Sequence, residues 1–209
     1  NKLQYERSKR NFHDEMKFNK LSKRNIDFAK FAVGALFDAR SVHFYSYSVD
    51  KEGAYFKREF YGDPWQAYQK IAVRLLKDVA LAPKEILILL ADYVAVPKNI
   101  RFEIDVKKEV NNSLKRLALA GVCRLDSRSN DLLQLVDLTI GAISYDLKIE
   151  TGAIKGGDEH KMDLLRFLKQ NLGADKFMSG FRNRNFNIFV DKDMRSRLPL
   201  KTNEKGPSS

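Results

Sequence analysis

The sequence is poor in cysteine and has no long apolar run. Its single cysteine, Cys123, cannot form an internal disulfide and excludes a zinc site built from several thiolates. No stretch approaches the ~18 consecutive apolar residues of a membrane-spanning helix. Residues 1–7 also lack the apolar core of a secretory signal. We therefore expect a protein of the reducing cytoplasm, with no membrane partner.

Several catalytic motifs are absent as well. The chain contains no GxSxG, HExxH, Walker A or GxGxxG motif. His43 and His160 have no sequence neighbours that would complete a catalytic triad. His13 stands beside Asp14 and Glu15, where it is open to two interpretations: a metal ligand or general base, or one of several exposed charged residues.

Positive charge is what the sequence has in excess. The 209 residues carry a net charge of +11, and 44% of them are hydrophobic. The hydrophobic fraction is sufficient for a packed core. The charge favours an anionic partner, with nucleic acid ahead of an acidic membrane surface.

Hydrophobic periodicity predicts alternating helices and strands, and therefore an α/β fold with helices packed on a sheet. Within the segment 85–91, all residues after Glu85 are apolar, which predicts a strand covered on both faces. Residues 54–61 are expected to form a loop or short strand. The predicted helices cover 22–39, 63–79, 99–120, 130–148 and 159–172, and the predicted strands 42–49, 85–91, 122–125 and 186–190.

Four segments are expected along the chain. Residues 1–20 form a basic, loosely structured segment, and 21–150 form the α/β core. Residues 151–198 add a helix and a strand as a C-terminal extension. Residues 199–209 are polar, with Pro, Gly and Ser, and are expected to be disordered.

Acidic residues follow three of the predicted strands: Asp50, Asp92 and Asp126. Sites in such sheets gather at the carboxyl ends of strands. Asp92 and Asp126 are candidate ligands for Mg²⁺ or Mn²⁺, hard ions that prefer carboxylate oxygens. The alternative is that each aspartate caps a turn or the following helix.

A third carboxylate, Asp137, lies on a narrow polar stripe of an otherwise apolar helix. The stripe faces either solvent or a polar cleft beside the sheet. Gln134, one turn earlier, is placed to orient Asp137 or to contact a substrate. The members of the stripe are Asn130, Gln134, Asp137, Gly141, Ser144 and Lys148.

Basic residues interleave with aromatic residues at 181–189. Arg182 and Arg184 are candidates for phosphate contacts, with Phe181 or Phe186 stacking on a base. The alternative is an edge strand with inward phenylalanines and outward polar residues. A second basic cluster, with the same two interpretations, contains Lys17, Lys20, Lys23 and Arg24.

The segment 125–138, Leu-Asp-Ser-Arg-Ser-Asn-Asp-Leu-Leu-Gln-Leu-Val-Asp-Leu, resembles the signature of the prokaryotic "domain of unknown function 3800" family. That signature is an aspartate–serine pair after a strand, then a helix with a glutamine-leucine-alanine-aspartate-leucine motif. Val136 stands in place of the alanine. Weaker matches follow the family's order: Glu15 with Lys17, residues 49–51, and residues 89–92.

The resemblance implies a ribonuclease-H-like fold, a mixed sheet flanked by helices, with a nuclease-type carboxylate site. It implies Asp92, Asp126 and Asp137 as ligands of Mg²⁺ or Mn²⁺, with Glu15 as a further catalytic residue. A metal-dependent nuclease is our first hypothesis, and a non-catalytic nucleic-acid-binding or structural subunit is the alternative. The residues expected to contact substrate are Ser127, Gln134, Lys51, Arg182 and Arg184.

One departure from the family pattern affects this expectation. The family begins with a central strand that carries an aspartate-glutamate-serine motif, and nothing before Glu15 matches it. We expect either an additional N-terminal segment or a partner chain to complete the sheet. The remaining alternative is that the strand has been lost, together with catalysis.

Overall fold

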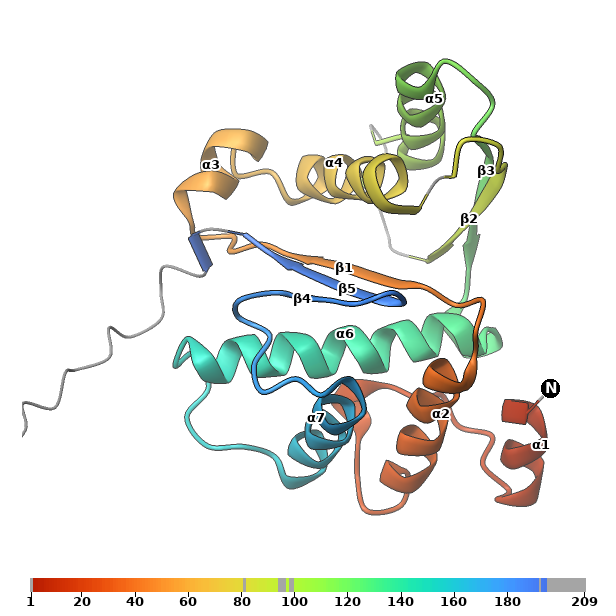
Figure 1. The fold of residues 1–209 in the computed structure, drawn as a ribbon, viewed down its shortest axis with the longest axis vertical. Helices are drawn as coiled ribbons and strands as arrows, with labels where there is room; N and C mark the ends of the chain where they lie inside the picture. The colour runs from red at the N-terminus through yellow and green to blue at the C-terminus, as the bar shows by residue number, and fades with distance from the viewer. Residues whose placement is uncertain (1, 81, 94–96, 98–99, 192, 195–209) are drawn as a thin grey trace, which may run out of the picture.

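The computed structural model describes residues 2–80, 82–93, 97, 100–191 and 193–194, and this part of the chain has an α/β fold (Figure 1). The α-helices are α1 (Lys2–Lys9), α2 (Ile26–Asp38), α3 (Ala54–Phe60), α4 (Pro64–Leu75), α5 (Phe102–Leu114), α6 (Asp131–Glu150) and α7 (Glu159–Leu172). The strands are β1 (Phe44–Ser48), β2 (Leu87–Asp92), β3 (Leu119–Leu125), β4 (Phe181–Arg182) and β5 (Phe186–Val190). Short turns of helix occur at η1 (Phe18–Lys20), η2 (Leu76–Ala80) and η3 (Ser127–Ser129).

A small mixed sheet joins β1, in the first quarter of the chain, to the C-terminal strands β4 and β5. Its strand order is β1-β5-β4, with β5 parallel to β1 and antiparallel to β4. Phe44 lies opposite Phe186, and Ser48 lies opposite Val190. Figure 1 shows α4 on one side of this sheet and α6 on the other, with α2 and α7 beyond α6. The predicted strand 186–190 is therefore the middle strand of the sheet.

The main core lies around α6. Leu138 and Ala142 of α6 are fully buried, together with Ala32 of α2 and Leu164 and Leu168 of α7. Full burial of a leucine side chain contributes about 1.5–3 kcal/mol. Predicted helices 130–148 and 159–172 agree with α6 and α7 because both carry apolar residues at helical spacing over many turns.

The second sheet consists of β2 and β3, which run parallel with Asp92 opposite Leu125. One face packs on α4 and α5, where Val73, Phe102 and Val106 are buried. The side chains of β2 alternate between half-buried and exposed, and Ile88 is 63% exposed. The prediction of a strand covered on both faces is therefore wrong for the described residues, because helices cover only one of them.

The N-terminal segment differs from the loosely structured one that was predicted. Residues 2–9 form α1, and Phe12, Met16 and Phe18 are buried in the main core. The contacts that order this segment come from α6, more than 110 residues later in the chain. Its basic composition gave no sign of those contacts.

Two other predicted elements were wrong. Residues 54–60 form α3, because Phe56 and Phe60, one turn apart, are both buried beside Ala67. Helix α5 ends at Leu114 rather than near residue 120, since Lys115 has a left-handed backbone (φ 51°). Gly121 accordingly lies within β3. The predicted disordered tail, 199–209, lies outside the described residues.

No helix in the described ranges is long and apolar enough to cross a bilayer.

Candidate functional site

Two carboxylates lie at adjacent strand ends of the β2–β3 sheet. Asp92 is the last residue of β2, and Asp126 follows Leu125, which lies opposite Asp92. The Tyr93 amide donates to the carbonyl of Leu125 at 2.9 Å and holds the two ends together. Both carboxylates are exposed and line one pocket. This pairing agrees with the sequence prediction, because parallel strands bring their carboxyl ends to the same edge.

Each aspartate also makes the local contact that the alternative interpretation describes. Asp126 Oδ1 accepts a hydrogen bond from the Arg128 amide at 2.9 Å and caps η3. Asp92 Oδ1 accepts one from the Tyr93 amide at 2.9 Å. Asp126 Oδ1 also lies 3.6 Å from Nε of Arg128. A carboxylate has about four acceptor positions, so these contacts leave acceptor capacity on both aspartates.

Glu15 reaches the same region from the N-terminal segment. The Ser127 hydroxyl donates to Glu15 Oε1 at 2.7 Å, and Lys17 Nζ lies 3.1 Å from the same oxygen. Burial by itself would raise the pKa of Glu15. The Ser127 hydrogen bond, with Lys17 and then Lys20, outweighs burial and lowers the pKa of Glu15 below its usual 4.5. Glu15 is therefore an ionised acceptor between a hydroxyl and an ammonium group.

The pocket between the strand ends, the carboxylate pocket, has a volume of about 290 Å³. It is lined by Lys17, Asp92, Tyr93, Asp126, Ser127 and Arg128.

A larger pocket of about 750 Å³, the cationic pocket, adjoins it. Its charged lining residues are four cations and two carboxylates: Lys17, Lys20, Arg24, Arg128, Asp14 and Glu15. Lys17 and Arg128 line both pockets. Positive charge thus extends up to the edge of the paired carboxylates.

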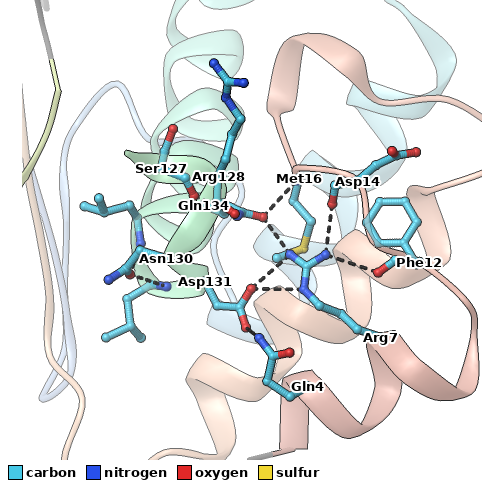
Figure 2. Close-up of polar contacts among 12 residues, drawn as sticks. Gln4, Arg7, Phe12, Asp14, Met16, Ser127, Arg128, Asn130, Asp131 and Gln134 are labelled. Carbon is cyan, nitrogen blue, oxygen red and sulfur yellow. Dashed lines mark hydrogen bonds and ion pairs between the residues drawn. The ribbon is translucent and has the colours of Figure 1, made fainter. Parts of the chain in front are cut away.

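A buried network fixes the N-terminal segment beside the site (Figure 2). The guanidinium of Arg7 contacts Asp131 at 2.9 Å and Gln134 Oε1 at 2.7 Å. It also donates to the carbonyls of Phe12, at 3.3 Å, and Asp14, at 2.9 Å. Because Asp14 directly precedes Glu15, Arg7 holds the loop that carries Glu15 and Lys17 against the start of α6.

Gln134 lies at the centre of this network and is only 1% exposed. Its Oε1 accepts from Arg7 and from the Met16 amide, and its Nε2 donates to the carbonyls of Ser127 and Arg128. Both ends of the amide are therefore engaged within the protein. In this arrangement Gln134 supports the site, and its contact with a substrate stays a prediction.

Asp137 does not line the carboxylate pocket. Its Oδ2 accepts a hydrogen bond from the Phe18 amide at 2.8 Å, and the residue is exposed. The residues of the polar stripe on α6 have different surroundings. Gln134 is buried, Asp137 accepts a hydrogen bond from η1, and Gly141 packs against the Phe18 ring. The structure therefore brings Asp92, Asp126 and Glu15 to one region and leaves Asp137 outside the pocket.

The remaining predicted residues lie elsewhere. Lys51 is exposed in the turn after β1 and lines neither pocket. Arg184 lines a separate pocket of about 420 Å³ with Arg40 and Asn185. Arg182 lines another, of about 230 Å³, with Tyr47, Arg74 and Phe189 among others. Their contact with a substrate stays a prediction.

In the described part of the chain, no group of three or more His, Cys, Asp and Glu side chains is arranged to hold a metal ion. The donors present are nevertheless of the kind that Mg²⁺ uses. Mg²⁺ keeps several waters and binds through one or two carboxylates together with substrate phosphates. Asp92 and Asp126 are two such carboxylates in one pocket, and their binding of Mg²⁺ or Mn²⁺ stays a prediction.

Three residues of the site were not predicted. Arg7 gave no signal, because a basic residue in a basic segment does not stand out until its burial is known. Arg128 lies inside the segment 125–138, and Tyr93 directly follows the predicted aspartate Asp92. Attention to the residues flanking each strand-end aspartate would have found both.

No protein-family model matches the chain, and comparison with curated proteins and with solved structures finds no similar protein.

Proposed function

We propose that the chain binds nucleic acid at the cationic pocket and acts on its phosphodiesters at the carboxylate pocket with the help of a divalent cation. The supporting observation is that Lys17 and Arg128 line both pockets. A polyanion held along the cationic pocket would have a phosphate beside Asp92 and Asp126.

Each group has a definite role in this proposal. Asp92 and Asp126 supply the oxygen ligands for Mg²⁺ or Mn²⁺, which would polarise the phosphate and lower the pKa of a bound water. Lys17 and Arg128 bind the phosphate oxygens and offset their charge. Glu15 keeps Lys17 in place through their ion pair, and the Ser127 hydroxyl keeps Glu15 in place.

The resemblance to the domain of unknown function 3800 family supports the same proposal, since its strongest segment contains Asp126 and Ser127. A ribonuclease-H-like identity for this α/β fold is part of the proposal. So is completion of the sheet by a further segment or a partner chain. Separately, the exposed side chains of β2 leave one face of the β2–β3 sheet for such a partner to cover.

A non-catalytic nucleic-acid-binding subunit is the second candidate function. One observation favours it: the described residues contain no group of three metal-ligating side chains. In that case Asp92 and Asp126 serve only as caps of the segments that follow them.

Cleavage of end-labelled DNA and RNA oligonucleotides, with Mg²⁺, with Mn²⁺ and with EDTA, separates the two candidates. We expect metal-dependent products that disappear in both Asp92→Asn and Asp126→Asn. Asp175→Asn, an exposed aspartate outside both pockets, is the matched control and should cleave normally. Binding without cleavage by the unmodified protein would support the second candidate. Equal cleavage by all variants would show that the carboxylate pocket is not the active site.

A further inference from the structure

We infer that the nucleic acid recognised here is single-stranded, with one unpaired base stacked on Tyr93. This inference rests on the proposed function and narrows its substrate class.

Tyr93 is the aromatic side chain of the carboxylate pocket. It directly follows Asp92 and is 69% exposed. Its amide is fixed by the hydrogen bond to the Leu125 carbonyl, so the backbone beneath the ring is held to β3. A phenol ring on a fixed backbone, open to solvent and next to cations, is a stacking platform for a base.

The size of the pocket favours one nucleotide. About 290 Å³ lies just below the range for small-molecule sites, roughly 300–1,000 Å³. A base can enter such a space and present its face to Tyr93 only if it is unpaired. In a duplex the base faces are covered by neighbouring bases, and only their edges are accessible in the grooves.

The shape of the site also favours a single-stranded nucleic acid over a duplex. Reading base edges in the major groove of a duplex takes a helix or a two-stranded ribbon that projects into that groove. Here the candidate residues come from two strand ends, η3 and the loop at 14–17, and they line concave pockets. A concave cationic pocket beside an exposed aromatic ring is the arrangement that binds a flexible strand through phosphates and stacking.

In this arrangement the two pockets bind neighbouring nucleotides of the single-stranded nucleic acid. Lys20 and Arg24 lie in the cationic pocket only and bind phosphates on one side of the stacked base. Lys17 and Arg128, shared by both pockets, bind the phosphate next to that base. Asp92 and Asp126 lie beside that phosphate, which is the one proposed to be cleaved.

Fluorescence anisotropy in EDTA tests this without cleavage. The probes are a labelled 12-residue oligothymidine, a DNA duplex of the same length, and a 12-residue strand with abasic sites in place of thymidine. We expect the oligothymidine to bind at least tenfold more tightly than the duplex. Tyr93→Ala should weaken oligothymidine binding by about tenfold, within the range for loss of one stacked base. Tyr93→Phe, which keeps the ring, should bind normally.

Two controls distinguish the loss of base stacking from a change in phosphate binding and from a loss of folded protein. Binding of the abasic strand should be the same for Tyr93→Ala and the unmodified protein, because no base is present to stack. Tyr5→Ala removes a ring of similar exposure, 67%, that lines neither pocket, and should not change binding. Circular dichroism should show equal folding of the variants, as expected for exposed side chains.

A second experiment tests whether the nucleic acid lies along the cationic pocket. Lys20→Ala with Arg24→Ala should flatten the salt dependence of oligothymidine binding, by about 0.7 in the log–log slope for each phosphate that the variant no longer neutralises. The same change at Lys107 and Lys108 of α5 should leave the slope unchanged.

The outcomes separate this inference from the proposed function. Tighter binding of the duplex, or equal loss of abasic and oligothymidine binding in Tyr93→Ala, would overturn the single-strand inference even if Asp92→Asn abolishes cleavage. Oligothymidine binding that depends on Tyr93, in a protein that cleaves nothing, would support the inference while phosphodiester cleavage fails. Absence of binding to every probe would overturn both.

Discussion

The guanidinium of Arg7 donates to the side-chain oxygen of Gln134 at 2.7 Å, across 127 positions of sequence (Figure 2). The same guanidinium is paired with Asp131, and the side chains of this pair are 8% and 14% exposed. An N-terminal helix is thereby fastened to the start of α6. Since the loop between Arg7 and Phe18 carries Glu15 and Lys17, this pair determines where those two residues lie.

Arg7→Met should therefore be strongly destabilising. Methionine keeps most of the packing on Phe12 and Phe28 but leaves the Asp131 carboxylate without its counter-charge. Asp131 then keeps only the neutral hydrogen bond from Gln4, and the Gln134 oxygen keeps only the Met16 amide. Breaking a buried pair in this way costs about 3–5 kcal/mol. Chemical denaturation should show this loss of unfolding free energy. The matched control is Arg10→Met: Arg10 also lies over Phe28 and pairs with Glu6 four residues earlier, but its side chain is 39% exposed, and Lys9 also lies near Glu6. This change should cost about 0.3–0.5 kcal/mol. Equal losses in both variants would contradict this.

Replacement of Gly141 of α6 by alanine should destabilise the protein. A Cβ atom there would lie 2.3 Å from Cγ of Phe18, whose amide is held by Asp137 one turn earlier. The ring cannot retreat without breaking that hydrogen bond. Gly141→Ala should therefore lower the unfolding free energy by about 1–3 kcal/mol, as overpacking does.

Gly34 of α2 supplies the comparison for this glycine. A Cβ atom at Gly34 would meet the Phe167 ring at 3.5 Å, an ordinary contact. Gly34→Ala should raise the unfolding free energy by up to about 1 kcal/mol through helix propensity. Opposite signs in the two denaturation curves would confirm that close approach, rather than propensity, sets the requirement for glycine at 141.

Local pattern was sufficient to predict part of this fold. The long apolar periodicity of α6 and α7, the Asp63–Pro64 start of α4 and the apolar strand β5 are all local signals. The carboxylate pair was predictable for a related reason, since Asp92 ends strand β2 and Asp126 directly follows strand β3.

Contacts between distant residues were not predictable in this way. Nothing near Arg7 shows that its charge is met by Asp131, and nothing near Asp137 shows that it holds Phe18 rather than facing the pocket. The same limit applies to strand pairing, because β5 joins β1 across about 140 residues. Periodicity specifies which face of an element is apolar, and the partner of that face depends on the whole chain.

The acid stability of the protein should depend on Glu15. Its pKa in the folded state lies below the usual 4.5, so the ionised form stabilises the fold. That contribution is complete above about pH 4.5 and is lost as the pH falls through the lowered pKa. Ser127→Ala removes the hydrogen bond that most opposes the effect of burial, so the pKa of Glu15 should rise. Carboxyl chemical shifts followed by NMR should report the rise, and the acid-unfolding midpoint should move to higher pH.

Ser129→Ala is the matched control for that measurement. The Ser129 hydroxyl lies in the same turn η3 but donates to the carbonyl of Asp126 and not to Glu15. Its removal should leave the Glu15 titration unchanged. An equal shift in both variants would mean that loss of the turn, rather than of the Ser127 hydrogen bond, controls the pKa.

Two ion pairs of the same length at the C-terminal half of α6 should differ in importance. Lys169 Nζ lies 2.6 Å from Asp146, and Lys176 Nζ lies 2.6 Å from Glu150. The side chain of Asp146 is 3% exposed, and it also accepts a hydrogen bond from the Phe177 amide at 2.9 Å. Asp146 thus fixes both α7 and the segment leading to β4, whereas the ammonium of Lys176 is in water.

Asp146→Asn should consequently cost about 3 kcal/mol or more in unfolding free energy, because it leaves the largely buried ammonium of Lys169 without a counter-charge. Glu150→Gln should change the denaturation midpoint little, since water solvates Lys176 when its partner is neutral. Raising the salt concentration to 1 M should not rescue Asp146→Asn, because the lost pair is shielded from solvent. Equal stability of the two variants would show that the length of an ion pair, and not its burial, decides its contribution here.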